Sequence, residues 1–212
     1  MQSRSPQVLA LLASGAGVLG VGAVLAALME FGPHARHMAV HILVMNVAAP
    51  LLAAIGLTRW KVALRGASLL WPATFAQIAL LWAWHLPVVQ NVAAHVPGAM
   101  IASHASLLLA ATAFWMSLFS LSGPSRWQAI PALLLTAKLF CLLAALLVFA
   151  PRALYGSGAH AAHGLDDQHL AGLLMLAACP LSYLVAAVVM TVHLIGADEP
   201  PRAVPPIQRT AG

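Results

Sequence analysis

Charged side chains are scarce in this chain. Asp, Glu, Lys and Arg together make up 7% of its 212 residues, whereas 62% are hydrophobic and the mean hydropathy is +0.91. A soluble globular domain carries about a quarter charged residues, so this composition excludes that class and predicts a membrane protein. The apolar runs are continuous and lack the alternation of an outer-membrane barrel. We therefore expect an all-α polytopic bundle whose helices satisfy their own backbone hydrogen bonds in the lipid bilayer.

Groups that commonly carry catalysis are also nearly missing. Cys141 and Cys179 lie in different apolar runs without a CxxC spacing, and we expect both to be small buried hydrophobic residues. Asp166 and Asp167 are adjacent and point apart at an expected helix start. There is no Ser/His/Asp pattern, and the glycines at 15–22 lie inside an apolar run where they favour helix packing over phosphate binding. The sequence therefore does not predict an enzyme.

Six apolar runs are long enough to span a membrane, which takes about 20 residues. Their approximate bounds are 8–29, 37–57, 69–85, 97–121, 130–150 and 168–195. We expect residues 1–195 to form one transmembrane bundle. Residues 196–212, rich in proline and charge, are expected to form a disordered cytoplasmic tail. Pro180 follows Cys179 inside the sixth run and is expected to interrupt that helix and to kink it, because proline removes a backbone donor.

Basic residues favour one side of the membrane. Seven Lys and Arg residues, at positions 4, 59, 61, 65, 126, 202 and 209, lie on the side of the two termini, and only Arg36 and Arg152 lie on the other. The positive-inside rule then places both termini in the cytoplasm. The formal charge of +5 is too thinly spread for us to expect nucleic acid as a partner.

Histidines gather on the opposite, outer side. Nine of the ten fall at the outer helix ends or in the outer loops, and only His193 falls near the cytoplasmic side. His37 and His41 are four residues apart and share one helix face. His104 lies about 10 Å into the fourth expected helix, where an ionisable group is a functional candidate. This uneven distribution predicts a site at the outer face.

This set of side chains suits a copper site, and the alternative is that single histidines at the membrane interface only hydrogen-bond to water, headgroups or a carbonyl. The candidate ligands are His37, His41, Met45, His85, His104 and Asp167. Metal–imidazole bonds are about 2 Å long, so side chains one turn apart can reach one ion. Imidazole with thioether suits copper, and thioether favours Cu(I). Asp167 is a candidate ligand or a partner that orients a histidine ring. Met38 lies on another face and is expected to pack, and the loop residues His95, His160 and His163 are expected to be solvated.

The chain also resembles a known family. The motifs HMAVHILVM (37–45), WHLP (84–87), SHASLLLAATAFW (103–115), LY (154–155) and DQHLAGLLM (167–175) stand in the order seen in the CtaG family of cytochrome c oxidase assembly factors, the kind associated with caa3-type oxidases. The resemblance implies a multi-pass protein of the bacterial cytoplasmic membrane that helps to build a haem–copper oxidase and handles copper.

The resemblance also implies roles for single residues. The positions that match family motifs are His37, His41, His85, His104, Asp167, Gln168 and, less closely, Met45 and Met175. The family tends to have an acidic residue before the fourth-helix histidine, whereas Ser103 stands here. The expected function is to hold Cu(I) at the periplasmic face, to receive it from a periplasmic copper donor, and to pass it by ligand exchange to an oxidase subunit.

Three other functions are compatible with the sequence. His85 and His104 could be axial ligands from facing helices, as in a haem-binding membrane cytochrome or a haem-modifying oxidoreductase. A copper transporter would need ligands along a path through both halves of the membrane, and the inner half offers only His193, Lys138, Met190 and the cysteines. The third alternative is a scaffold that binds oxidase subunits and no metal.

Overall fold

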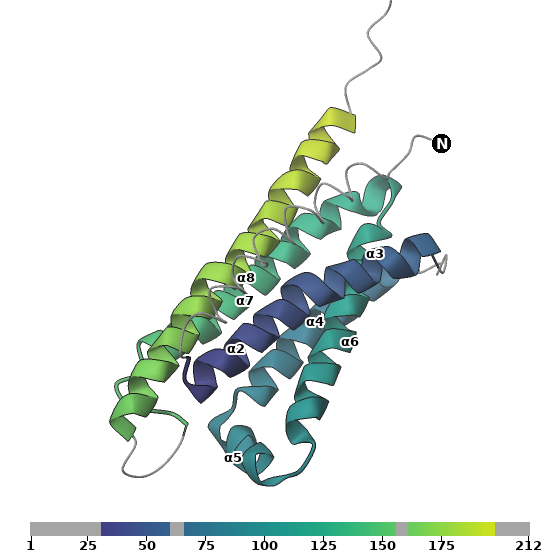
Figure 1. Ribbon diagram of the computed structural model, residues 1–212. Helices are drawn as coiled ribbons and strands as arrows, with labels where there is room; N and C mark the ends of the chain where they lie inside the picture. The colour runs from purple at the N-terminus through teal and green to yellow at the C-terminus, as the bar shows by residue number, and fades with distance from the viewer. Residues whose placement is uncertain (1–30, 60–65, 156–160, 198–212) are drawn as a thin grey trace, which may run out of the picture.

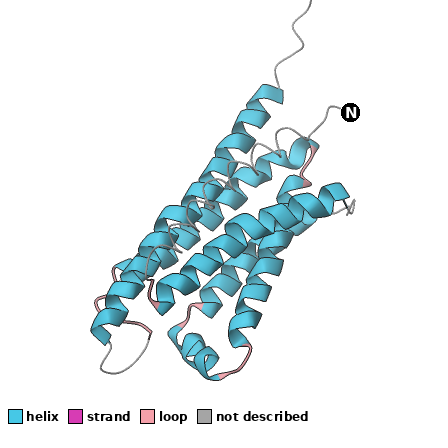
Figure 2. Ribbon diagram, in the orientation of Figure 1, coloured by secondary structure: helices cyan, strands magenta, loops and turns pink. Residues whose placement is uncertain are grey.

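Helices make up all the regular structure in the part of the chain that the computed structural model describes, which is residues 31–59, 66–155 and 161–197 (Figure 1). They are α2 (Pro33–Leu43), the π-helical turn η1 (Val44–Ala48), α3 (Ala49–Arg59), α4 (Gly66–Trp84), α5 (Pro87–His95), α6 (Ala99–Phe119), the 3₁₀ turn η2 (Gly123–Gln128), α7 (Ala129–Val148) and α8 (Ala161–Ala197). Figure 2 shows these helices joined by loops and turns. The all-α prediction is confirmed.

Five stretches are long and apolar enough to cross a membrane. They are Pro33–Thr58, Ala67–Trp84, Ala99–Phe119, Gly123–Val148 and Gly164–Val192. These stretches correspond to the second to sixth helices expected from the sequence, so the chain is a multi-pass membrane protein. The expected first helix at 8–29, His160 and the tail from residue 198 lie outside the described residues.

Several helix bounds differ from the expected ones. α2 begins at Pro33 and the unexpected helix α5 begins at Pro87, because proline is favoured in a first turn, where its missing N–H has no partner. α8 begins at Ala161, seven residues earlier than expected. The prediction that Pro180 interrupts the sixth helix is wrong, since α8 runs through Pro180 without a break. α8 packs along α7.

The helices pack in pairs that bring one set of ends together. α7 packs along α8, and α4 packs along α6. α2 lies against α8, whereas its continuation α3 lies against α6. α5 forms a short crossing at the end of the bundle where α4 ends and α6 begins (Figure 1). The first turns of α2 therefore lie at the same end of the bundle as α5.

The contact between α7 and α8 is very close at Gly172. A Cβ atom added there would lie 2.7 Å from Val148 Cγ2 and 3.0 Å from the backbone oxygen of Ala144. Small residues allow membrane helices to approach closely and pack by van der Waals contact. Further along the same contact, the rings of Phe140 and Tyr183 meet edge to face at 5.5 Å. α2 packs against the α8 side of this pair.

A π-helical turn joins α2 to α3. Pro50 lacks the N–H that would bond to the carbonyl of Asn46 four residues earlier, which explains why the helix widens just before it. The indole N–H of Trp115 donates to the backbone oxygen of Met45 at 3.2 Å and so satisfies a carbonyl within the widened turn. π-helical turns are frequent at functional sites, and this one begins three residues after His41.

Candidate metal centre

His37 and His41 lie one turn apart on α2 and touch each other. Their Nε2 atoms are 2.8 Å apart, and their rings meet edge to face at a centroid distance of 4.2 Å. His41 is 3% exposed, whereas His37 is partly exposed. Two nitrogen atoms that bind one tetrahedral metal ion through bonds of about 2.0 Å lie about 3.3 Å from each other. Small rotations of the two rings would therefore let both bind one ion.

His85 stands just beyond the last residue of α4 and is fixed from two sides. Its Nδ1 lies 2.6 Å from the backbone oxygen of Leu81. Since a carbonyl oxygen can only accept a hydrogen bond, Nδ1 carries the proton and donates it. The hydroxyl of Tyr155 donates to the backbone oxygen of His85 at 2.8 Å. Burial lowers the pKa of His85 from its usual value of 6.5 and raises the pKa of Tyr155 to about 12. His85 is therefore neutral at pH 7, with its Nε2 lone pair free to bind a metal.

His104 reaches the same place from α6. Its Nδ1–H donates to the backbone oxygen of Met100 at 2.7 Å, so in the neutral ring the lone pair is on Nε2. Its ring stacks on that of His41 at 4.7 Å and lies 5.3 Å from that of His37. Histidines that bind metals commonly donate the other ring N–H to a carbonyl or carboxylate. His85 and His104 both have this arrangement.

The four imidazoles form one cluster, called here the histidine group. One ligand atom from each of His37, His41 and His85 lies within 4.8 Å of the other two. Each of the four rings has one buried nitrogen without a hydrogen-bond partner: His37 Nδ1, His41 Nδ1, His85 Nε2 and His104 Nε2. Buried polar atoms nearly always have partners, and an exception calls for an explanation such as an ion. The donor set and these unpaired nitrogens fit a metal that prefers imidazole.

Asp167 lies outside the histidine group. Its carboxylate accepts from the backbone N–H of His34 at 2.8 Å and from that of Ala35 at 3.1 Å, and it thereby caps the N-terminus of α2. Gly32 is required beside it, because a Cβ atom there would collide with the Asp167 carboxylate. The carboxylate orients the helix that carries His37 and His41, and it does not orient a histidine ring directly.

Gln168 and Met45 also have clear surroundings. Gln168 is 1% exposed; its amide donates to the backbone oxygen of Leu147 at 3.2 Å and accepts from the N–H of Leu154 at 2.7 Å. This residue therefore ties α8 to the end of α7. Met45 is 3% exposed and lies in η1, where it lines a small cavity with His41.

Three residues beside the histidine group were not expected from the sequence. The amide Nε2 of Gln90, on α5, lies 3.4 Å from His37 Nε2. Gln90 and Ser103 line a cavity of about 60 Å³ with His37. The third is Tyr155, which holds His85. Proline at the start of the PVVQNVAAH stretch (87–95) is the signal that could have revealed α5.

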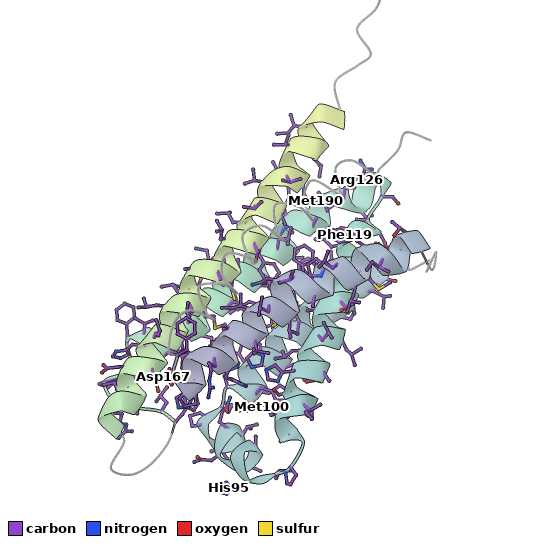
Figure 3. All side chains as sticks on the ribbon, viewed as in Figure 1. His95, Met100, Phe119, Arg126, Asp167 and Met190 are labelled. Atoms are coloured by element: carbon purple, nitrogen blue, oxygen red, sulfur yellow. The ribbon has the colours of Figure 1, made fainter. Side chains whose placement is uncertain are left out.

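Two histidines outside the group have ring contacts of their own in the described part of the chain. His95 is exposed, as expected, and its ring bonds to the backbone oxygen of Asn91. His34 lies beside the ring of Tyr155 at 5.3 Å. His163 and His193 belong to α8, but their side chains lie outside the described part of the chain. In Figure 3, His95, Met100 and Asp167 lie at one end of the bundle, and Arg126, Phe119 and Met190 lie toward the other.

Comparison with known proteins gives a single kind of match. The family model Caa3_CtaG, described as cytochrome c oxidase caa3 assembly factor, matches residues 3–197. No curated protein and no solved structure matches the chain. The matched range contains the whole histidine group together with Asp167.

Proposed function

The chain belongs to the cytochrome c oxidase caa3 assembly factors, and we propose that it serves assembly by holding copper as cargo in the histidine group. The ion is Cu(I), bound by His37, His41 and His85, with His104 as the fourth imidazole. The protein passes the ion to an oxidase subunit by ligand exchange, and it catalyses no reaction. Met45 and Asp167 are not ligands of this ion. Met45 lines the cavity next to His41, and Asp167 caps the N-terminus of the helix that carries His37 and His41.

The observation that carries this proposal is the set of unpaired nitrogens. Four buried ring nitrogens from three different helical segments lack partners, and ligand atoms of three rings lie within 4.8 Å of one another. Because the Nδ1–H groups of His85 and His104 donate to backbone carbonyls, the lone pair of each neutral ring is on Nε2. An imidazole site of this kind suits copper.

The location of the site supports exchange at the outer face. Arg36 and Arg152 are the basic residues near the histidine end in the described part of the chain, whereas the sequence pattern predicts seven others on the side of the termini. We infer that the histidine end faces the periplasm and that both termini face the cytoplasm of a bacterium. His37 borders the cavity of about 60 Å³ beside Gln90 and Met100, which offers an incoming ion a way to the group. A periplasmic copper donor would deliver the ion there.

Cavity size argues against the haem alternative. Sites for drug-sized ligands occupy about 300–1,000 Å³, whereas the two cavities beside the histidine group measure about 10 and 60 Å³. The four rings also lie within 4.2–6.0 Å of His37 or His41, which leaves no room for a porphyrin between them. A small ion fits this space.

A copper-binding measurement tests the proposal. The purified full chain is titrated with Cu(I) under reducing conditions in competition with a coloured Cu(I) chelator. We expect the His37→Ala/His41→Ala variant to lose at least about 100-fold in affinity for the imidazole-bound ion, since it removes two ligands where even supporting residues are worth about 10–100-fold. In cells, the same variant should fail to mature the oxidase, while the matched variant His95→Ala should mature it normally. Normal maturation with the double variant would refute the proposal.

A further inference from the structure

A small cavity lined by sulfur lies directly below the histidine group. It has a volume of about 10 Å³, and its wall includes Met38, Met45, Met175, Cys179 and His41. The rest of the wall is apolar. A cavity of this size is close to what a single water molecule needs, about 10–15 Å³, so it has room for one small ion. We call it the sulfur cavity.

The sulfur atoms come together from distant parts of the chain. Met38 and Met45 belong to the continuous α2–η1 segment, and Met175 and Cys179 lie one turn apart on α8. All four side chains are at most 5% exposed. Three of the eight methionines of the chain thus meet at one point. The amide of Asn46 donates a hydrogen bond to Cys179 Sγ at 3.7 Å.

The chemistry of this wall selects a particular ion. Thioether and thiolate sulfur are soft ligands that prefer Cu(I), whereas hard cations such as Mg²⁺ and Ca²⁺ need oxygen ligands. No carboxylate lines the cavity. An uncompensated charge in an apolar cavity is costly. Binding of Cu(I) by Cys179 releases the thiol proton to solvent, and the resulting copper–thiolate unit carries no net charge.

We propose that the sulfur cavity is a second Cu(I) site, formed by the thioethers of Met38, Met45 and Met175 and the thiolate of Cys179. This inference rests on the proposed function for the identity of the ion, but it uses different ligands. His41 borders both sites, because its ring belongs to the histidine group and also lines the cavity. An ion leaving the histidine group toward the membrane interior therefore meets the sulfur ligands next. The inner site keeps Cu(I) away from water and excludes harder ions.

Metal counting combined with X-ray absorption tests this site. The full chain in lipid nanodiscs is loaded with excess Cu(I) without oxygen and washed with a weak chelator. We expect two copper ions per chain, with both nitrogen and sulfur neighbours. The variant Met38→Leu/Met45→Leu/Met175→Leu/Cys179→Ala should keep one copper with nitrogen neighbours only. Leucine nearly conserves the volume of methionine, and helical circular dichroism checks that the variant folds.

Matched controls use sulfur residues outside the cavity. The variant Met116→Leu/Met190→Leu/Cys141→Ala removes two methionines and the other cysteine from α6, α8 and α7, and it should keep both copper ions. The complementary variant His37→Ala/His85→Leu should keep one copper with sulfur neighbours. That result would separate the two sites, because each set of substitutions removes a different ion.

The possible results distinguish this inference from the proposed function. One copper per wild-type chain, with nitrogen neighbours only, would overturn the sulfur site and leave the histidine group standing. A sulfur-bound copper that persists in the four-residue variant would also overturn it. One copper with sulfur neighbours, lost in that variant, would support the sulfur site and refute the histidine group. A wild-type chain that binds no copper would overturn both.

Discussion

The α7–α8 contact and the histidine group differ in how tightly their side chains pack. At Gly172 the two helices leave no space for a methyl group, and the nearby rings of Phe140 and Tyr183 are fully buried. In the histidine group, four buried nitrogens lack partners, and cavities of about 10 and 60 Å³ lie on either side. One region is packed tightly, and the other has unpaired polar atoms with free space around them.

This difference separates stability from function. An unpaired buried polar group costs about 1–3 kcal/mol, so the histidine group lowers the stability of the copper-free protein. Such groups persist where they serve a site, and the rest of the structure holds them in place. The α7–α8 contact supplies this support, because α2 rests on α8. Substitutions in the two regions should therefore affect different measurements.

The largest expected effect is a loss of stability at the α7–α8 contact. Gly172→Leu places a side chain where even a Cβ atom would lie 2.7 Å from Val148 Cγ2. We expect the helices to separate and the free energy of unfolding to fall by about 3 kcal/mol, measured by thermal unfolding in detergent. Gly164→Ala is the control, because its nearest neighbour would be Ala153 Cβ at 4.0 Å. Equal stability of the two variants would show that the close contact between α7 and α8 at Gly172 does not stabilise the protein.

The next effect concerns copper and leaves stability almost unchanged. His85→Leu removes one ligand and also one unpaired buried nitrogen. We expect affinity for the imidazole-bound copper to fall by about 100-fold, while the unfolding free energy of the copper-free protein changes by less than about 1 kcal/mol. Chelator competition and thermal unfolding measure the two quantities. His95→Leu, at an exposed position, should alter neither. A large loss of stability without loss of affinity would assign His85 to the structural region instead.

Local sequence patterns predicted the helices and the histidines that meet. The spacing of His37 and His41 fixes their contact, because residues four apart share a helix face. The long apolar runs and the position of each histidine at an outer helix end indicated that His85 and His104 would lie at the same end of the bundle. The structure brings all four rings together.

Other features depend on packing that the sequence pattern does not contain. Asp167 caps α2, which lies 132 or 133 residues earlier in the chain. The sequence predicted only that Asp167 lies at the start of a helix, and not which helix its carboxylate contacts. Met38 was expected to pack, and its position on the wall of the sulfur cavity depends on how α2 meets α8. The π-helical turn that carries Met45 has no periodic signal, since it changes the helix phase over only five residues.

The smallest expected effect joins the two regions. Asp167 lies on α8 yet holds the first turn of α2 through two backbone N–H groups. Replacing a capping side chain with alanine costs about 0.5–2 kcal/mol, so Asp167→Ala should lower the unfolding free energy of the copper-free protein by about 1 kcal/mol. It should also weaken copper binding by about 10-fold, the low end of the loss for a supporting residue, because the two ligands on α2 lose their fixed position but remain present.

The copper-free measurement decides between a cap and a ligand at this position. If Asp167 were only a copper ligand, its removal would hardly change the stability of the copper-free protein. If it caps α2, its removal lowers that stability whether or not copper is present. Asp167→Asn should recover part of the loss, since its amide oxygen still accepts one of the two N–H groups. Asp166→Ala, next to it and exposed, should change nothing. A loss seen only with copper bound, together with a lost oxygen neighbour in X-ray absorption, would place Asp167 among the ligands and connect α8 directly to the ion.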